Sequence, residues 1–314
     1  MFNSTSNNNL ALYWGQDQAG NQQLLSSYCK SNSADIYVVS FLDSFSGNHT
    51  NATGEVAVSF EGSLESLGSQ IKACQGLGRK VLVSLGGETG KYGLKNPSDG
   101  DVLAEQLWDA FGGGKNSSVD RPFGDAVIDG FDLDIEHGNP VGYGNLVNRL
   151  RQLYAEDASK KYYVSAAPQC PFPDEWINEV LMFSQIDFAF VQFYNNDCGL
   201  EDEGFNFDQW AHFARTMAAN KHMKVFLGVP GSKKSTDSGY VGVPVLRKFI
   251  QKLRNNTAFG GVMMWDASSA FSNKEHGIPY VEYAKDALNG VVSNSADRNV
   301  VSGALLGVVL ALLL

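Results

Sequence analysis

The feature that most constrains the fold is a repeated alternation of apolar runs with amphipathic helical patterns. The apolar runs recur at intervals of roughly 25 to 45 residues, as strands do in parallel sheets covered by helices on both faces. Right-handed crossovers then allow few topologies. We expect strands over residues 10–16, 36–45, 80–87, 127–136, 162–170, 186–196, 224–231 and 260–270. Apolar residues at three- and four-residue spacing predict helices over residues 64–74, 102–111, 146–154, 207–219 and 245–254.

The number of expected strands favours a closed barrel. The chain has 314 residues, and a (β/α)8 barrel needs roughly 250 or more, although this length also fits two ordinary domains. An open doubly wound sheet is disfavoured, because no expected strand is followed by G-x-G-x-x-G and the glycine-rich stretch at residues 112–116 lacks the Ser or Thr of a P-loop. No linker or repeat follows the eighth run. The sequence therefore predicts an α/β fold, a single-domain (β/α)8 TIM barrel.

The charge balance argues against a nucleic-acid partner. The chain carries 34 acidic and 24 basic residues, for a formal charge of −10. A surface of this sign repels phosphates, so neutral ligands fit better. With 43% hydrophobic and 18% charged residues, the chain can bury a large core.

The candidate chemistry lies in the fourth expected strand, which ends in the sequence DGFDLDIE at residues 129–136. Successive side chains of a strand point to opposite faces, so Asp132, Asp134 and Glu136 share one face and the apolar residues between them share the other. If the apolar set meets the helices, the carboxyls line the barrel and rise towards its C-terminal mouth, where barrel active sites lie. A solvated strand face does not fit the fourth of eight strands in a closed barrel.

Stacked carboxyls repel one another, so at least one of their pKa values should rise, as a general acid working near neutral pH requires. A Mg²⁺ site is the rival interpretation. Three acids about 6–7 Å apart along one strand fit a proton relay better than a coordination shell. Zinc is disfavoured because the chain has no H-E-x-x-H and no C-x-x-C, and His137 points away from the Glu136 face. We expect neither a metal nor a cofactor.

Sequons and cysteines are compatible with an oxidising, secretory compartment, although chance also produces sequons in an Asn- and Ser-rich chain. Four cysteines allow three pairings. The sequons are at Asn3, Asn48, Asn51, Asn116 and Asn255.

The C-terminal residues match the pattern of a glycosylphosphatidylinositol (GPI) signal. Residues 300–314 carry no charge and are shorter than the ~20 apolar residues that span a bilayer. Small residues around Asn294, a polar spacer over 290–299 and this apolar tail form the signal, with a short tail anchor as the alternative.

Residues 1–9 are polar, so we expect them to be disordered. They lack an apolar h-region, so we hypothesise that a signal peptide precedes them, which mapping the native transcript start would test.

Four motifs and one tryptophan occur in the order found in a known family. The acidic strand matches the D-x-x-D-x-D-x-E signature of family 18 glycoside hydrolases. The sequences LYWGQ at 12–16, SLGG at 84–87 and QFYNN at 192–196, together with Trp265, resemble the class III, hevamine-like chitinases of plants and fungi. The resemblance covers about residues 10–289.

The resemblance implies four catalytic residues. Glu136 would donate a proton to the glycosidic oxygen. Asp134 would hold the 2-acetamido group of the substrate while its carbonyl oxygen attacks C1 to give an oxazolinium ion, so that no enzyme nucleophile is needed. Asp132 would share a proton as Asp134 turns, and Tyr194 would hydrogen-bond to the acetamido carbonyl.

The resemblance further implies a sugar pocket, cis peptides and two disulfides. Trp265 would form the floor beneath the reacting sugar, next to Gln192. A single aromatic or Gln on a barrel strand is more often core filler, but the joint placement of these residues at strand ends favours a cleft. Non-proline cis peptides are expected before Phe41 and after Trp265. Further binding candidates are Tyr13, Phe41, Gln16 and Asn195, the structural motif residues are Asp129 and Gly130, and the implied disulfides are Cys29–Cys74 and Cys170–Cys198.

These features predict an extracellular or wall-associated endo-chitinase that cleaves β-1,4-linked N-acetylglucosamine with retention. Its partners would be chitin or chito-oligosaccharides, and it would act as a monomer held at the membrane or wall by the GPI anchor. One alternative is a catalytically weak, lectin-like barrel that only binds oligosaccharide. Another is the same chemistry on peptidoglycan or the N-glycan core, which the loops would decide. The complete set of catalytic residues favours an enzyme.

Overall fold

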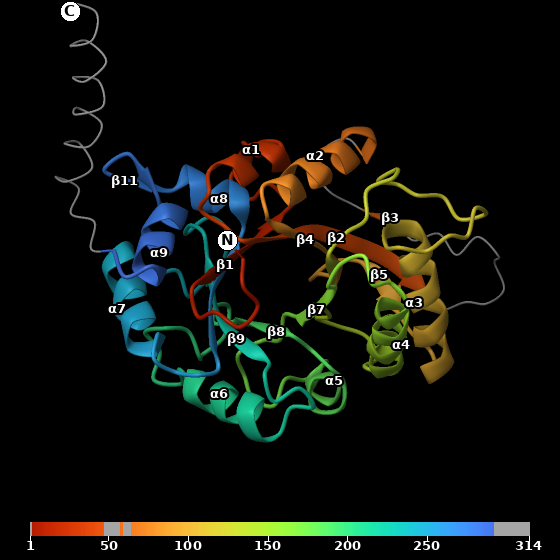
Figure 1. Ribbon diagram of the computed structural model, residues 1–314. Coiled ribbons are helices and arrows are strands. Elements are labelled where there is room, and N and C mark those ends of the chain that lie inside the picture. Colours follow the sequence, from red (N-terminus) through yellow and green to blue (C-terminus); the bar gives the residue numbers. More distant parts are fainter. Residues whose placement is uncertain (1, 47–56, 59–63, 292–314) are drawn as a thin grey trace, which may run out of the picture.

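The computed structural model describes residues 2–46, 57–58 and 64–291, and within them eight parallel strands close into a ring (Figure 1). The order around the ring is β1-β10-β9-β8-β7-β6-β4-β2, and β2 pairs with β1 to close it. This confirms the predicted single-domain (β/α)8 TIM barrel. The strands are β1 (Asn9–Trp14), β2 (Ile36–Ser46), β4 (Lys80–Gly86), β6 (Gly130–Asp134), β7 (Tyr163–Ala166), β8 (Phe188–Gln192), β9 (Lys224–Pro230) and β10 (Phe259–Trp265).

Helices cover the outside of the ring (Figure 1). The five predicted helices are present as α2 (Leu64–Gly76), α3 (Pro97–Phe111), α4 (Tyr143–Glu156), α6 (Phe207–Thr216) and α7 (Val243–Leu253). Four shorter helices, for which no range was predicted, are α1 (Leu25–Lys30), α5 (Asn178–Phe183), α8 (Ala267–Ser272) and α9 (Tyr280–Leu288). Short strands β3 (Ala57–Val58), β5 (Lys91–Gly93), β11 (Lys274–Glu275) and β12 (Ile278–Pro279) lie outside the ring.

The expectation that the eighth strand continues to residue 270 was wrong. It ends at Trp265, and Asp266 then caps α8, because its Oδ1 accepts a hydrogen bond from the backbone N–H of Ser269 at 3.0 Å. The fourth, fifth and sixth expected strands also end earlier than predicted, at Asp134, Ala166 and Gln192. Their last residues leave the ladder and form the rim of the barrel.

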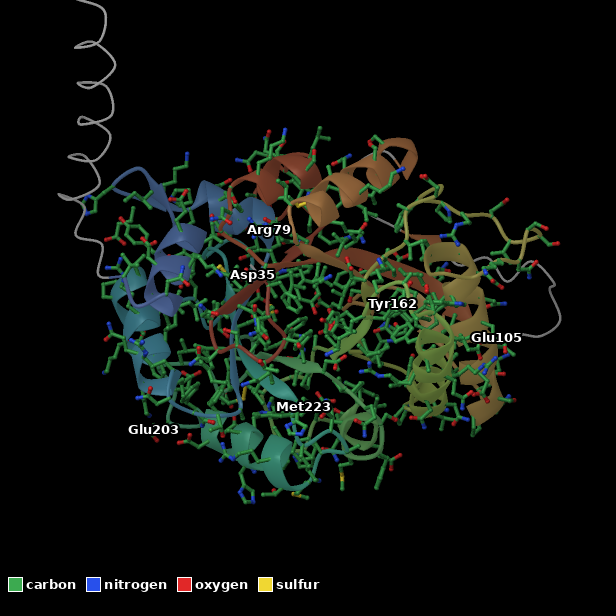
Figure 2. All side chains as sticks on the ribbon, viewed as in Figure 1. Asp35, Arg79, Glu105, Tyr162, Glu203 and Met223 are labelled. Carbon is green, nitrogen blue, oxygen red and sulfur yellow. A yellow bond between two sulfur atoms is a disulfide. The ribbon has the colours of Figure 1, made fainter. Side chains whose placement is uncertain are left out.

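Alternate residues of each strand enter two separate apolar clusters. Phe131 and Leu133 of β6 pack outward with the helices, whereas Tyr13 and Phe190 belong to a cluster inside the ring. Side chains fill this interior (Figure 2). The barrel is therefore packed, and a site for substrate must lie at one of its ends.

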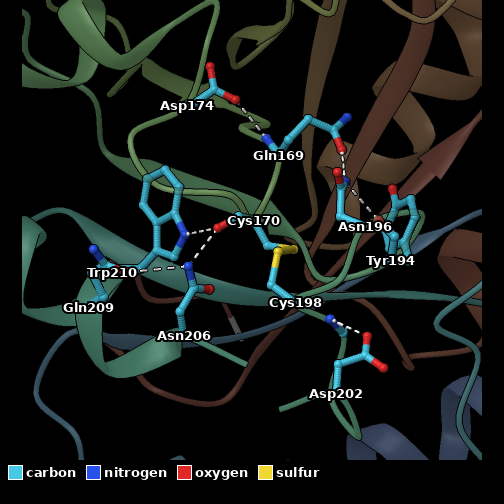
Figure 3. Close-up of a disulfide and its surroundings, with 11 residues drawn as sticks. Gln169, Cys170, Asp174, Tyr194, Asn196, Cys198, Asp202, Asn206, Gln209 and Trp210 are labelled. Carbon is cyan, nitrogen blue, oxygen red and sulfur yellow. Dashed lines mark hydrogen bonds between the residues drawn. A yellow bond between two sulfur atoms is a disulfide. The ribbon is translucent and has the colours of Figure 1, made fainter. Parts of the chain in front are cut away.

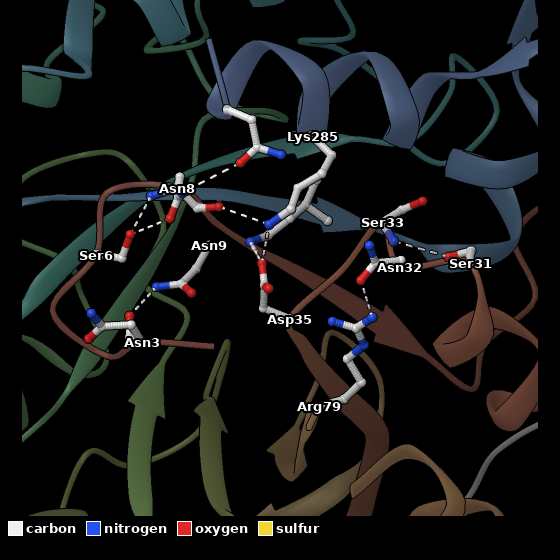
Figure 4. Close-up of polar contacts among 12 residues, drawn as sticks. Asn3, Ser6, Asn8, Asn9, Ser31, Asn32, Ser33, Asp35, Arg79 and Lys285 are labelled. Carbon is white, nitrogen blue, oxygen red and sulfur yellow. Dashed lines mark hydrogen bonds and ion pairs between the residues drawn. The ribbon is translucent and has the colours of Figure 1, made fainter. Parts of the chain in front are cut away.

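Residues 2–9 pack against the barrel, whereas their composition led us to expect disorder over residues 1–9. Phe2 packs edge-on against Tyr163 of β7 and Phe188 of β8, with ring centroids 5.3 and 6.1 Å away. The Asn9 side chain donates to the backbone carbonyl of Asn3 at 2.8 Å (Figure 4). The asparagines that made this segment look disordered instead satisfy its backbone, while one aromatic side chain anchors it to the barrel.

A buried ion pair ties the last helix to the first two strands. Asp35 directly precedes β2 and accepts hydrogen bonds from the Leu10 backbone N–H at 2.9 Å and from Lys285 Nζ at 2.5 Å. Lys285 of α9 also donates to the backbone carbonyl of Asn8 at 3.0 Å (Figure 4). These contacts and the N-terminal segment occupy the start of the strands, the barrel end that serves stability.

Asp129 and Gly130 hold the start of β6 in place, in keeping with the structural role implied for them. The buried Asp129 carboxylate accepts from the Val81 backbone N–H at 2.9 Å and lies 3.3 and 3.4 Å from Lys80 and Lys160. Gly130 has a φ of +150°, and a Cβ there would collide with the carbonyl oxygen of Tyr163 on β7. Any other residue would push β6 and β7 apart.

The four cysteines form the two disulfides that the resemblance implied. Cys29 pairs with Cys74, and Cys170 with Cys198, over Cα distances of 5.4 and 6.0 Å. The cis peptides expected before Phe41 and after Trp265 are also present.

Two of the candidate glycosylation sites, Asn116 and Asn255, are exposed. Asn48, Asn51 and Asn294 lie outside the described residues, as does the apolar tail. Within the described residues, the helices are all too short or too polar to cross a bilayer.

Candidate active site

Asp132 lies at the centre of the barrel interior, held by three hydroxyl donors. The strand register places it level with Ser84 on β4 and Ser165 on β7. Their hydroxyls donate to its carboxylate at 2.7 and 2.5 Å, and the Tyr13 hydroxyl donates at 2.7 Å. Burial raises the pKa of Asp132, and the three hydrogen bonds oppose that rise.

Asp134 lies one step further towards the mouth, on the same face of β6. Its Oδ1 accepts from Gln192 Nε2 at 3.0 Å, and its side chain is buried. Burial raises its pKa well above the usual range, and the charges of Glu136 and Asp132 raise it further. Asp134 is therefore able to carry a proton at pH values where an ordinary aspartate is ionised.

Glu136 lies just beyond the end of β6 and is only partly buried. Gln169 Nε2 donates to its Oε2 at 2.9 Å. Burial raises the pKa of Glu136 to about 7, helped by the charges of Glu88 and Asp174, and the Gln169 hydrogen bond acts in the opposite direction. The three carboxyls form the expected ladder from the interior to the rim, and the outermost carries a proton near neutral pH.

The raised pKa of Glu136 predicts the pH at which activity is lost on the alkaline side of the pH–activity profile. A general acid works in its protonated form, so activity should be lost as the pH rises through about 7 and Glu136 ionises. The measurement is kcat/KM against pH. A limb near pH 4 to 5, the range of an unperturbed carboxyl, would contradict a shifted Glu136 as the acid.

A cleft of about 520 Å³ opens above the acids. Trp265 and Phe41 form one wall, with rings stacked 5.6 Å apart at 23°. Flat aromatic surface next to amide and carboxyl groups suits a sugar, which has apolar C–H faces and polar edges. Of the residues expected to bind substrate or act on it, the cleft is lined by Asp134, Glu136, Tyr194, Trp265, Gln192, Phe41, Gln16 and Asn195.

Two expected sugar-binding residues have other contacts. Tyr13 does not line the cleft: it is 1% exposed, and its hydroxyl is committed to Asp132 beneath it. The Asn195 side chain lines the cleft, but its Oδ1 accepts from the backbone N–H groups of Asp237 and Ser238 at 3.0 and 3.1 Å and so shapes the loop after β9.

Some residues of the site were missed from the sequence. Gln169 and Asn196 both line the cleft, with Asn196 Nδ2 donating to Gln169 Oε1 at 2.7 Å. Gln169 lies near the end of the fifth expected strand, beside a cysteine, and that position was the available signal. Glu88 and residues 234–237 also line the cleft. Within the described residues, no three His, Cys, Asp or Glu side chains converge as metal ligands.

A ladder of three carboxyls below an aromatic, amide-lined cleft at the C-terminal mouth of a TIM barrel is an arrangement typical of carbohydrate-active barrels. Comparison with known families identifies the family to which this barrel belongs. The profile of glycosyl hydrolases family 18 matches residues 9–240, and the chain belongs to this family.

Individual relatives agree with this assignment. The chain is 45% identical over 291 residues to the endochitinase of Saccharomyces cerevisiae, covering 91% of this chain and 51% of that protein. It is 42% identical over 297 residues to chitinase 1 of Candida albicans, covering 94% of this chain and 62% of that protein. The chain thus spans about half to three fifths of the length of these two relatives.

Among solved structures, the xylanase and alpha-amylase inhibitor protein from Scadoxus multiflorus matches with a TM-score of 0.76 and 30% identity, covering 91% of this chain and 99% of that one. The barrel thus also occurs in a protein described as an inhibitor, so the fold alone does not decide activity.

Proposed function

We propose that the protein is an endo-chitinase that hydrolyses β-1,4 linkages between N-acetylglucosamine residues with retention of the anomeric configuration. The observation that carries the proposal is the position of Glu136 at the barrel mouth, able to hold a proton near neutral pH, directly above the more deeply buried Asp134. The names of the fungal relatives, endochitinase and chitinase, support the choice of substrate.

In this mechanism the substrate supplies its own nucleophile. Glu136 passes its proton to the glycosidic oxygen as the bond from that oxygen to C1 breaks. The acetamido carbonyl oxygen bonds to C1 on the opposite face, and the leaving sugar departs with the proton. Glu136, now ionised, removes a proton from a water molecule that attacks C1 and opens the oxazolinium ring. The product keeps the β configuration, and Glu136 is protonated again.

The deeper residues stabilise the acetamido group as it attacks. Asp134 would turn from Gln192 to accept a hydrogen bond from the acetamido N–H. Asp132 stays in place because three hydroxyls hold it, so it can take up charge or a proton as Asp134 moves. Burial keeps the pKa of Tyr194 well above the usual range, so its phenol stays protonated and can donate to the acetamido carbonyl.

A catalytically weak, lectin-like barrel is the second candidate, because the structural match to an inhibitor protein shows that this fold also occurs in a protein that is not described as a chitinase. The enzyme and the lectin-like barrel differ in whether they need a protonated carboxyl in the cleft. A barrel that only binds sugar has no use for a protonated carboxyl at its rim, whereas Glu136, Asp134, Asp132 and Tyr194 are all present here and burial raises the pKa of each. The same chemistry could act on peptidoglycan or on the N-glycan core. Comparing the rates of hydrolysis of these two substrates with that of chitin would distinguish these alternatives.

Chelation separates this proposal from metal-assisted hydrolysis. We expect activity to be unchanged by EDTA, because the proposed acid and nucleophile are the Glu136 carboxyl and the substrate amide. Turnover is measured before and after dialysis against EDTA, with and without added Mg²⁺ or Zn²⁺. Loss of activity that either metal restores would overturn the assignment.

The direct test of the proposed function is incubation with chitin oligosaccharides beside their de-N-acetylated counterparts. Substrate assistance requires the N-acetyl group, so only the acetylated series should be cleaved. Cleavage of both series at similar rates would contradict assisted catalysis. Binding without cleavage of either would favour the lectin-like alternative.

We further infer a location at the cell surface or wall. Two disulfides and the relationship to fungal chitinases support passage through the secretory route. Attachment through a GPI anchor at Asn294 rests on the sequence of residues 290–314. Release of the protein from intact cells by a phosphatidylinositol-specific phospholipase would test it.

A further inference from the structure

The side chain that holds Glu136 belongs to Gln169, which the mechanism above does not use. Gln169 lies beyond the end of β7, on the rim of the cleft, and its Nε2 donates to Glu136 Oε2 at 2.9 Å. We infer that Gln169 is a positioning residue that decides which carboxyl oxygen of Glu136 carries the catalytic proton. The inference rests on the proposed function and adds to it a residue acting through the acid.

The orientation of the Gln169 amide follows from its second partner. Asn196 Nδ2 donates both to Gln169 Oε1 at 2.7 Å and to the backbone carbonyl of Tyr194 at 3.2 Å (Figure 3). A backbone carbonyl can only accept, so it keeps the NH₂ group of Asn196 on this side. That group requires an acceptor, which is Gln169 Oε1, and this turns the NH₂ group of Gln169 towards Glu136. The result is a one-way relay that starts at a backbone carbonyl and ends at the acid.

The polarity of the relay has a chemical consequence. An amide NH₂ group donates and cannot accept, so a proton on Glu136 Oε2 would face another hydrogen. Of the two oxygens of a protonated carboxyl, the carbonyl oxygen is the stronger acceptor, so the Gln169 donor at Oε2 favours the form of Glu136 that carries its proton on Oε1. Among the described residues, no side chain hydrogen-bonds to Oε1, which leaves this oxygen available to the glycosidic oxygen of a substrate.

The backbone on both sides of the relay is tied down, so the two amides have little freedom to turn away. The buried carboxylate of Asp174 accepts from the Gln169 backbone N–H at 2.9 Å. The Cys170–Cys198 disulfide joins the residue after Gln169 to the loop that carries Asn196 (Figure 3). A packed disulfide next to the relay gives it the rigidity that positioning requires.

Besides Gln169, several charged groups also influence the pKa of Glu136. Burial and the charges of Glu88 and Asp174 favour the protonated form of Glu136, whereas the donor of Gln169 favours the ionised form. The other titratable groups around the cleft are Asp134 on β6, Asp43 on β2, Tyr92 on β5, Tyr194 beyond β8, and Lys234 and Asp237 in the loop after β9.

The test is the pH profile of three variants. Gln169→Leu removes a donor that stabilises ionised Glu136, so the pKa of Glu136 rises and the alkaline limb moves up by about one pH unit. At the acid plateau kcat falls about tenfold while KM changes little, because the proton no longer favours Oε1. Asn196→Leu gives a smaller shift in the same direction, since the Gln169 amide is then free to turn. The double variant matches Gln169→Leu alone, because Asn196 reaches Glu136 only through Gln169.

Gln209→Leu, an exposed substitution on α6, is the matched control and leaves the limb in place. The titration of the Glu136 carboxyl by ¹³C NMR gives a second readout that needs no turnover, and it should rise with the limb. If the wild-type protein cleaves no chitin oligosaccharide, the proposed function fails while this titration still tests the relay. An unchanged titration in Gln169→Leu, or shifts that add in the double variant, would overturn the relay.

Discussion

Glu136→Gln should abolish most turnover and leave oligosaccharide binding nearly intact. The amide keeps the size of the carboxyl but has no acidic proton to give, and general acid catalysis by one residue contributes about 10²- to 10⁴-fold. We therefore expect kcat to fall by about 10³-fold, with little change in the Kd for a chitin oligosaccharide. Steady-state kinetics and calorimetry measure the two quantities. Glu105→Gln, on the outer surface of α3 (Figure 2), is the matched control and should behave as wild type.

The acidity of the leaving group decides whether cleavage needs a proton from Glu136. An N-acetylglucosaminide with a dinitrophenolate leaving group needs no protonation, so its first bond cleavage should be far less affected in Glu136→Gln than that of a natural linkage. An equal loss on both substrates would show that Glu136 acts in some other way. Normal turnover of chitin oligosaccharides by the variant would remove Glu136 from the mechanism.

Asp134→Asn should lower turnover by about 10²- to 10³-fold, the usual effect of removing one preorganised group that stabilises a developing charge. Asparagine keeps the shape of the side chain and can still contact Gln192, but it carries no negative charge to balance the oxazolinium ion. The loss should persist with the activated leaving group, because the reaction still requires attack by the acetamido oxygen. This persistence distinguishes Asp134→Asn from Glu136→Gln.

Asp101→Asn, on the surface helix α3, provides the matched control for this second variant. Rates are compared on chitin oligosaccharides and on the dinitrophenyl glycoside at the same pH. A variant with the full wild-type rate on either substrate would exclude Asp134 from support of the acetamido group.

The barrel and its acidic ladder were predictable from sequence because they obey simple periodicities. Strands covered on both faces are apolar along their whole length, and a period of two places Asp132, Asp134 and Glu136 on one face wherever β6 lies. The ladder of acids could therefore be predicted without knowing which residues surround it. The short helices α1, α5, α8 and α9 were missed because six to nine residues show little periodicity.

The parts that could not be predicted depend on contacts between distant loops. Gln169 and Asn196 are ordinary polar residues until the ends of β7 and β8 bring them together beside Glu136. Tyr13 was expected to contact sugar, yet its hydroxyl reaches Asp132 across the barrel. Phe2 likewise anchors a segment whose composition indicated disorder. In each case a tertiary contact, absent from any local pattern, decides the outcome.

The central claim is that the acetamido group of the substrate attacks C1 while Glu136 protonates the leaving oxygen. The most direct measurement follows the first product of chitin oligosaccharide cleavage by ¹H NMR, before mutarotation, and identifies its anomer. Two inversions at C1 predict that the β anomer forms first. Initial release of the α anomer would mean a single displacement by water and would contradict the mechanism.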